Sequence, residues 1–172
     1  MIKRFGPLLY VVLAACASGQ DGLDALHADI VSDYPSVSHV SADAVGDALF
    51  LDIREPDEFA VSRIPGAVRV PPDASEAEVL ARLGDVSGRR IVAYCSVGRR
   101  SSVFARAMQD ALVAEGAVSV SNLEGGVFGW HADRRPLENA DGATDAVHPY
   151  DEIWKRYVPR QDAVSYRPVG AP

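Results

Sequence analysis

Short apolar runs that alternate with amphipathic stretches restrict the fold of this chain more than any other feature. Residues 49–53 and 91–94 are largely apolar and too short for helices, a pattern typical of strands buried on both faces of a sheet. Residues 55–61 and 102–115 follow them and have the spacing of helices. Strands that alternate with helices pair in parallel through right-handed crossovers, and their functional sites lie at the carboxyl end of the sheet. The sequence therefore predicts an α/β fold with a parallel sheet.

Further elements follow from helical spacing, capping residues and turn signals. Ser75 and Glu78 have the spacing of a capping box at the start of one helix, and Pro35 ends another. We expect helices at 23–34, 41–47, 75–83 and 150–157, strands within 64–71 and 118–121, and a helical turn that carries Phe128 and Trp130. Residues 138–146 and the residues after Val158 are expected to be irregular.

A cysteine stands where the strand at 91–94 ends and a short turn leads into the next helix. Unpaired backbone N–H groups and the positive end of that helix would surround the Cys95 sulfur and favour thiolate over thiol. Gly98 permits backbone angles that strain other residues, and Arg99 and Arg100 add positive charge that suits an anionic substrate. We expect a reactive thiol, the alternative being a buried structural cysteine at a strand end.

The first residues have the pattern of an export signal. Lys3 and Arg4 form a positive start, residues 5–14 supply a short apolar run, and small residues follow. Residues 13–16, Leu-Ala-Ala-Cys, are similar to the lipobox of bacterial lipoproteins, in which the cysteine carries the lipid. We expect residues 1–16 to be a signal peptide with lipidation at Cys16, the alternative being ordinary cleavage after Ala17. Both alternatives predict an exported protein.

Charge and cysteine content narrow the possible functions. The chain of 172 residues fits a single domain, and its net charge of −7 argues against nucleic acid as a partner. Of its two cysteines, Cys16 is lipidated or removed, which leaves Cys95 without a partner. A lone thiol in an oxidising compartment is typical of a reactive group. The histidines are scattered without ligand spacing, and no nucleotide-binding motif is present, so we expect neither a metal nor a cofactor.

Three motifs together resemble the rhodanese family. They are Leu-Asp-Ile-Arg-Glu-Pro at 51–56, Ile-Pro-Gly-Ala at 64–67 and Tyr-Cys-Ser-Val-Gly-Arg-Arg-Ser at 94–101. They occur in the family's order and spacing and are followed by Leu-Glu-Gly-Gly at 123–126. The resemblance implies a rhodanese-like α/β fold with a central parallel sheet of about five strands flanked by helices. It also implies a catalytic cysteine, in a cradle of backbone amides, that accepts a sulfane sulfur as a persulfide and passes it on.

The export signal and the resemblance, which covers residues 37–136, together divide the chain into four parts. A signal peptide at 1–16 precedes a tether and N-terminal helix at 17–36, a rhodanese domain at 37–136 and a C-terminal extension with a short helix at 137–172. Four residues separate Cys95 from Arg100, whereas the loops of protein tyrosine phosphatases have five at this place. The shorter loop is similar to that of the sulfurtransferase members. One departure is Ser62-Arg63 where many relatives have Gly-His, a position that is not catalytic.

The candidate site consists of the nucleophile Cys95, the loop after it and two supporting charges. We expect Arg100 to orient the loop and stabilise an anion, and Arg99 to point outward, where it either recruits substrate or is a plain surface residue. Asp52 and Arg54 end the neighbouring strand and are expected to support the loop through a mutual salt bridge. Ser101 either donates its hydroxyl to the loop or only starts the helix. The loop residues are Ser96, Val97, Gly98, Arg99, Arg100 and Ser101.

The sequence thus predicts an exported sulfurtransferase, anchored by lipid in the bacterial cell envelope and facing the periplasm, or else soluble in the periplasm. Cys95 would take sulfane sulfur from thiosulfate, a polysulfide or a persulfide and pass it to cyanide, a small thiol or a protein thiol. Two alternatives use the same loop. One is a binding module without catalysis, and the other is a phosphatase or arsenate reductase.

Overall fold

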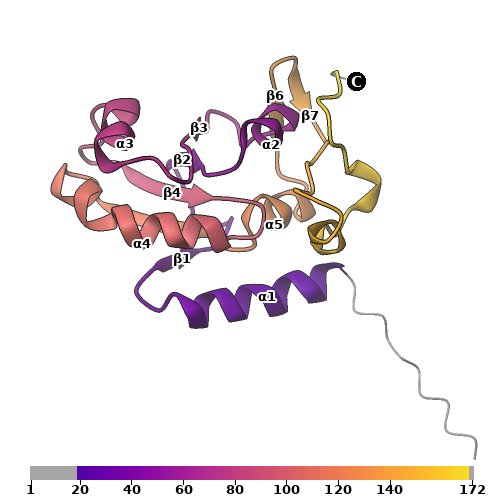
Figure 1. Ribbon diagram of the computed structural model, residues 1–172, viewed down its shortest axis with the longest axis horizontal. Coiled ribbons are helices and arrows are strands. Elements are labelled where there is room, and N and C mark those ends of the chain that lie inside the picture. The colour runs from indigo at the N-terminus through magenta and orange to yellow at the C-terminus, as the bar shows by residue number, and fades with distance from the viewer. Residues whose placement is uncertain (1–18, 171–172) are drawn as a thin grey trace, which may run out of the picture.

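The computed structural model describes residues 19–170, and its centre is a five-stranded sheet in the order β1-β5-β4-β2-β3. Every pair of neighbouring strands in this sheet runs parallel, which confirms the predicted α/β class. Figure 1 shows helices on both faces of the sheet. The strands are β1 (Ser38–Val40), β2 (Leu49–Asp52), β3 (Val68–Arg69), β4 (Arg90–Tyr94) and β5 (Ser119–Leu123). Of these, β1 was not predicted, because its three residues give too short an apolar pattern.

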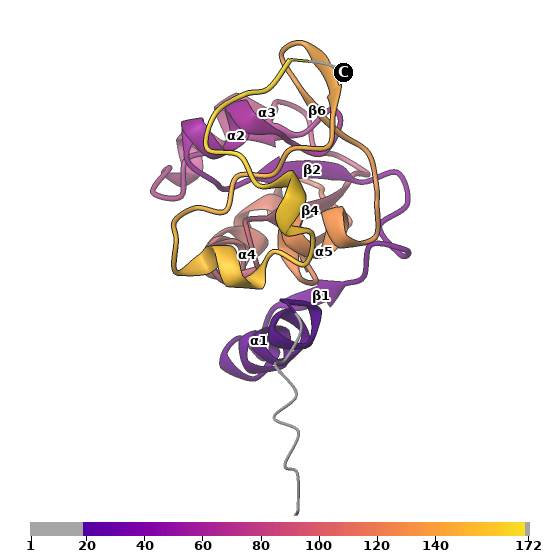
Figure 2. The same ribbon diagram turned by 90° about the vertical axis from the view of Figure 1, so that its right-hand side faces the viewer.

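Five helices and two short 3₁₀ turns surround this sheet within the described residues. Seen along the strands, α3 and α4 lie on one face and α5 on the other, while α1 lies beside the edge strand β1 (Figure 2). The helices are α1 (Gly19–Asp33), α2 (Pro56–Val61), α3 (Glu76–Leu83), α4 (Arg99–Ala114) and α5 (Gly126–Ala132), and the 3₁₀ turns are η1 (Trp154–Tyr157) and η2 (Gln161–Ala163). The capping box predicted at the start of α3 is present.

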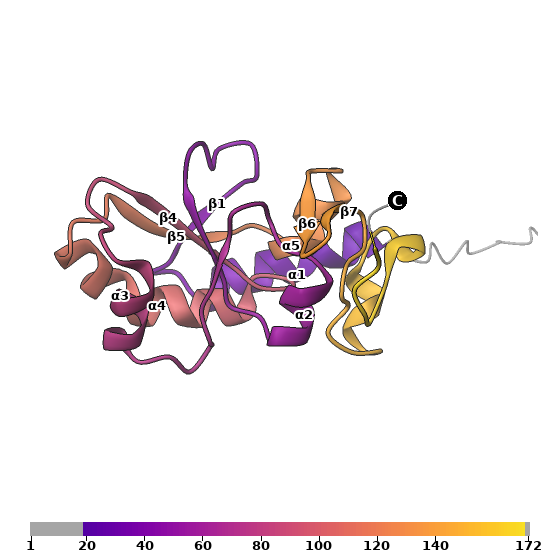
Figure 3. The same cartoon turned by 90° about the horizontal axis from the view of Figure 1, so that it is seen from above.

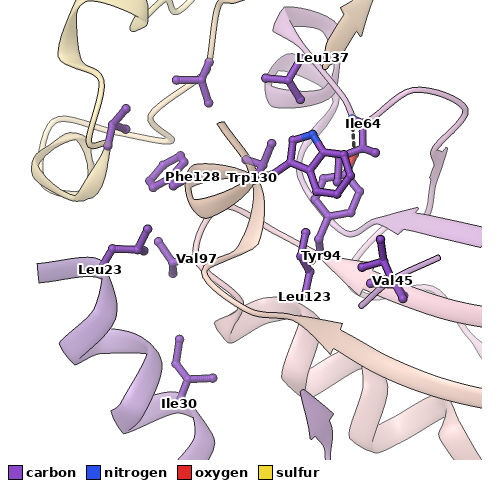
Figure 4. Close-up of a cluster of buried hydrophobic side chains, with 14 residues drawn as sticks. Leu23, Ile30, Val45, Ile64, Tyr94, Val97, Leu123, Phe128, Trp130 and Leu137 are labelled. Atoms are coloured by element: carbon purple, nitrogen blue, oxygen red, sulfur yellow. Dashed lines mark hydrogen bonds between the residues drawn. The ribbon is translucent and has the colours of Figure 1, made fainter. Parts of the chain in front are cut away.

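Strand β4 divides the core into two hydrophobic clusters because its side chains alternate between the two faces. Ile91 and Ala93 belong to the cluster beneath α3 and α4, whereas Val92 and Tyr94 belong to the cluster around α1, α5 and the C-terminal segment. Figure 4 shows Tyr94 inside the second cluster, where its hydroxyl accepts a hydrogen bond from the backbone of Ile64. Burial on both faces holds the end of β4 in a fixed place, and the predicted nucleophile follows directly after it.

Two predictions near the N-terminus of the described chain are wrong in detail. Residues 41–47 form a turn instead of a helix, because Gly46 adopts a φ of +57° that a right-handed helix does not allow. Arg90 also binds the carbonyl of Val45 at 2.9 Å and so fixes the turn. Helix α1 begins at Gly19, so most of the segment expected to be a tether is helical.

The C-terminal extension is more ordered than the sequence indicates. Residues expected to be irregular form an antiparallel hairpin of β6 (Leu137–Asn139) and β7 (Gly142–Thr144), joined by a turn at Ala140 and Asp141 and followed by Gly142 with a φ of +121°. Of the helix predicted at 150–157 only η1 is present, and Tyr150 has a φ of +72° that a right-handed helix does not allow. The segment after Val158 contains η2 and a backbone bridge between Val147 and Val164.

Helix α5 begins against the end of β4. The amides of Val127 and Phe128 donate to the carbonyl oxygens of Cys95 and Ser96 at 2.8 and 3.1 Å. Gly126 makes this approach possible, because a Cβ atom there would lie 2.5 Å from the Cys95 carbonyl oxygen. Its φ of +56° adds a second reason for glycine.

None of the helices within residues 19–170 is both long and apolar enough to cross a membrane. The predicted signal peptide and Cys16 lie outside the residues that the structure describes.

Substitution of Gly126 by alanine tests the close approach of α5 to β4. Gly66 is a matched control, because its φ is +73° and no atom lies within 4 Å of a Cβ there. We expect Gly66→Ala to cost about 1–2 kcal/mol of unfolding free energy from backbone strain. Gly126→Ala should cost at least about 1–3 kcal/mol more, because it adds a steric clash. Urea denaturation of both variants measures the difference, and equal losses would contradict the close packing described here.

Candidate active site

The Cys95 sulfur lies between the end of β4 and the start of α4. Gly98, with a φ of +104°, is the N-cap of this sixteen-residue helix, and its amide lies 3.2 Å from Sγ as a hydrogen-bond donor. A side chain at Gly98 would meet Asn122 Nδ2 at 3.0 Å, so the turn depends on glycine for space as well as for φ. The sulfur thus lies at the positive end of a long helix, an environment that stabilises negative charge.

The buried carboxylate of Glu58, in α2, binds two side chains of the cysteine loop. It forms a bidentate ion pair with Arg100, with both N–O distances at 2.8 Å, and accepts a third hydrogen bond from Ser96 Oγ at 2.8 Å. Arg100 also donates to Ser96 Oγ at 3.1 Å. The three side chains therefore tie both ends of the loop to one point in α2.

The charges in this network are mutually stabilised. Burial alone would raise the pKa of Glu58, but the hydrogen bonds and charge of Arg100, with the charge of Arg54, hold it below its usual value. Burial alone would lower the pKa of Arg100, but Glu58 and the nearby Cys95 sulfur raise it above its usual value. Arg100 therefore stays positive beside the sulfur and can stabilise an anion there.

The Cys95 side chain is only 1% exposed, yet it lines a cavity of about 210 Å³. Two aromatic residues of the C-terminal extension, Tyr150 and Trp154, complete the wall opposite the loop. The other lining residues are Ser96, Val97, Arg99 and Arg100. Figures 1 and 3 show the C-terminal segment, in gold, at the end of the sheet where the strands finish. Cys95 thus lines a small cavity whose wall the extension helps to form.

The remaining loop residues have different surroundings. Arg99, at the edge of the cavity, pairs with Asp33 of α1 at 3.1 Å, and the two side chains are 42% and 52% exposed. Val97 is buried in the cluster that contains Leu23 and Phe128 and so anchors the loop to the core. Ser101 donates its hydroxyl to Asn122 Oδ1 of β5 at 2.6 Å, which fixes the first turn of α4 against the neighbouring strand.

Asp52 and Arg54 form a completely buried ion pair, with their closest N–O distance at 2.6 Å. Arg54 also donates to the carbonyl of Ser62 at 2.6 Å, which ties the end of β2 to the end of α2. Burial alone would lower the pKa of Arg54, but Asp52 raises it above its usual value. The pair supports α2, and α2 carries Glu58, so its effect on the cysteine loop is indirect.

Three residues of the site were not identified from the sequence. Glu58 was not singled out, although it lies in the first turn of the helix predicted at 55–61, which follows a strand that ends at the site. Tyr150 and Trp154 lie in the segment predicted as a helix at 150–157, but they are more than 50 residues from Cys95 in the sequence, so no local signal places them near it. Within residues 19–170, no group of three or more potential ligands is placed to hold a metal ion.

Substitution of Glu58 by glutamine tests the network. The folded-state pKa of Glu58 is lowered from 4.5, so its ionised form contributes stability above that pH and loses it as pH falls through the folded value. We expect Glu58→Gln to lower the free energy of unfolding by about 2–3 kcal/mol near neutral pH. Urea denaturation should show this difference shrinking as the pH falls below 4.5.

Glu115→Gln, at the exposed end of α4, is the control and should change stability by less than about 0.5 kcal/mol. A Glu58→Gln effect that was equally small near neutral pH, or that grew toward acid, would contradict the assigned ion pair.

Comparison with known proteins places this geometry in a family. The model of the rhodanese-like domain matches residues 39–133, more than half of the chain. A protein named sulfurtransferase from Allochromatium vinosum is 33% identical over 112 residues, which cover 64% of this chain and 95% of the relative.

Two solved structures are also similar. One is a thiosulfate sulfurtransferase from Pseudomonas aeruginosa, with 20% identity, 81% of this chain and 26% of that chain covered, and a TM-score of 0.49. The other is a protein from Rhodopseudomonas palustris described as a possible tyrosine phosphatase, with 25% identity, 68% and 94% coverage, and a TM-score of 0.47. At these TM-scores neither similarity bears on the choice between sulfur transfer and phosphate chemistry. The parallel sheet and the cysteine loop agree with the match of the rhodanese-like domain. This chain belongs to the rhodanese family, as the match of the domain model and the sequence relative show.

Proposed function

We propose that this protein is a sulfurtransferase that carries sulfane sulfur as a persulfide on Cys95. The observation that carries the proposal is the position of Cys95, which lines a cavity at the N-terminus of α4 and whose Sγ lies 3.2 Å from the Gly98 amide. Arg100 supplies a fixed positive charge in the same cavity wall. An anionic sulfur donor suits such a site, because both the helix terminus and the guanidinium favour negative charge.

The reaction has two balanced steps. The Cys95 thiolate attacks the outer sulfur of thiosulfate, a new S–S bond forms, and the original S–S bond breaks with its electron pair leaving on sulfite. The persulfide that results keeps a negative terminal sulfur, which the loop amides and Arg100 stabilise. An acceptor thiolate or cyanide then attacks that terminal sulfur and releases the Cys95 thiolate. A polysulfide or a persulfide serves as donor by the same displacement.

Sulfur transfer is favoured over phosphate chemistry by the loop. Four residues lie between Cys95 and Arg100, and the side chain of Arg100 is engaged by Glu58 through both of its terminal nitrogens. A tight loop of this kind fits a single sulfur atom better than a tetrahedral phosphoryl group. The similarity to the Allochromatium sulfurtransferase agrees with this choice.

The intact mass of the purified protein after exposure to thiosulfate tests the proposal. We expect wild type to gain one sulfur atom and to lose it on addition of cyanide or a thiol, because both reactions pass through the persulfide. Cys95→Ser should gain none, whereas the control Cys16→Ser should gain sulfur like wild type.

A wild-type protein that gained no sulfur from thiosulfate, a polysulfide or an organic persulfide would refute sulfur transfer. Hydrolysis of an aryl phosphate that depended on Cys95 would then identify a phosphatase. Absence of both activities would identify a binding module.

We also propose that the protein is exported and held in the cell envelope by lipid on Cys16, facing the periplasm. The proposal is supported by the positive start, the apolar run and the Leu-Ala-Ala-Cys sequence at 13–16. Export also agrees with the proposed role of Cys95, because a cysteine without a disulfide partner in an oxidising compartment is typical of a reactive thiol.

Expression of the full chain in a bacterium that processes lipoproteins tests this assignment. Wild type should incorporate labelled fatty acid and fractionate with membranes, and Cys16→Ser should lose both properties because the acceptor sulfur is gone. Cys95→Ser is the matched control and should keep both. A Cys16→Ser protein that still carried lipid and remained in the membrane fraction would overturn the assignment.

A further inference from the structure

The cavity at Cys95 is built from two parts of the chain that differ in chemistry. The loop side presents the thiol, the peptide amides and Arg100, and this side suits the charged end of a sulfur donor. The opposite side consists of the aromatic rings of Tyr150 and Trp154, which lie outside residues 39–133 of the rhodanese domain. A small inorganic anion has no apolar group that could pack against these aromatic rings.

The segment that carries these rings is held in place by its own contacts. Val147 and Val158, on either side of it, are completely buried, and the backbone of Val147 bonds to Ala163 and Ser165 at 3.0 Å each. Asp145 and Arg160 form a further ion pair across its ends. These contacts fix the segment as part of the site.

Each ring has a defined position within this segment. The amide of Tyr150 donates to His148 Nδ1 at 3.0 Å, and the backbone of Tyr150 has a φ of +72°. The guanidinium of Arg100 then lies 4.8 Å from the centre of the Tyr150 ring. The amide of Trp154 is capped by Asp151 Oδ1 at 2.9 Å. A non-glycine residue in left-handed backbone costs free energy, so the surrounding contacts must hold it there.

We infer that Tyr150 and Trp154 determine donor specificity and that the protein prefers sulfur donors that carry an apolar, planar group next to the transferable sulfur. This inference rests on the proposed sulfur transfer at Cys95. The cavity of about 210 Å³ limits the group to roughly the size of a single ring. Such a group packs against the two aromatic rings while the anionic sulfur faces the amides and Arg100.

Organic thiosulfonates are donors that isolate this effect. The Cys95 thiolate attacks the terminal sulfur of R–SO₂–S⁻, an S–S bond forms to Cys95, and the bond to the sulfonyl sulfur breaks with its electron pair leaving on the sulfinate R–SO₂⁻. No oxidant or reductant is needed, and the charge is the same on both sides. Methanethiosulfonate and benzenethiosulfonate share this chemistry and differ in the apolar group R.

The ratio of kcat/KM for benzenethiosulfonate to kcat/KM for methanethiosulfonate, with one thiol acceptor, tests the inference. We expect this ratio to fall about tenfold in Tyr150→Ala and in Trp154→Ala, because each loses an aromatic contact to the ring. Tyr150→Phe and Trp154→Phe should restore most of the wild-type ratio. Ile153→Ala is the matched control, because Ile153 is 65% exposed, lies between the two residues and does not line the cavity. Its ratio should equal that of wild type.

A second measurement needs no variant. The same two donors reacting with a free small thiol give the intrinsic ratio of reactivities, and wild type should exceed that ratio by about tenfold. If wild type matches the free thiol, or if the alanine variants keep the wild-type ratio, the inferred specificity is wrong while sulfur transfer at Cys95 stands. If wild type takes sulfur from thiosulfate but from neither thiosulfonate, the inferred specificity is also wrong. If it takes sulfur from none of these donors, nor from a polysulfide or an organic persulfide, the proposed function itself fails.

Discussion

The ion pair between Glu58 and Arg100 is the interaction on which the site depends. Its carboxylate binds both terminal nitrogens of the guanidinium and also the hydroxyl of Ser96, so one buried residue of α2 fixes the start and the end of the cysteine loop. Around this point the loop is closed from two other sides, by Val97 in the core and by α5 against the carbonyls of Cys95 and Ser96. On the other side of the loop, the amide of Gly98 donates to Cys95 Sγ at 3.2 Å. The positive environment of Cys95 is therefore built by backbone and by one ion pair.

The sequence predicted the parts of this molecule whose patterns are local. The buried runs at 49–53 and 91–94, the capping box at Ser75 and the turn at Gly98 each carry their own signal, and together they led to the parallel sheet and to the cysteine at its carboxyl end. Where tertiary contacts determine the local structure, the sequence predictions were wrong or absent. Residues 41–47 form a turn because of the hydrogen bond from Arg90 and the positive φ of Gly46. The three residues of β1 form a strand because they pair with the edge of β5.

The role of Glu58 could not be predicted from spacing alone, because Arg100, with which it forms an ion pair, lies 42 residues away in α4. The same holds for the C-terminal extension. Its hairpin and turns are stabilised by distant contacts, among them the backbone pairing of Arg63 with Glu138 at 2.8 and 2.9 Å. The C-terminal extension thus supplies part of the cavity wall at Cys95 from outside residues 39–133, which match the rhodanese-like domain.

A crystal structure of the protein after exposure to thiosulfate addresses the central claim most directly. The account predicts one additional sulfur atom bonded to Cys95 Sγ, within hydrogen-bond distance of the loop amides and beside Arg100, with no sulfite group attached to it. Glu58 should keep its contacts with Arg100 and Ser96 in that structure. Intact thiosulfate beside an unmodified Cys95, or a persulfide whose terminal sulfur points away from the amides, would contradict the account.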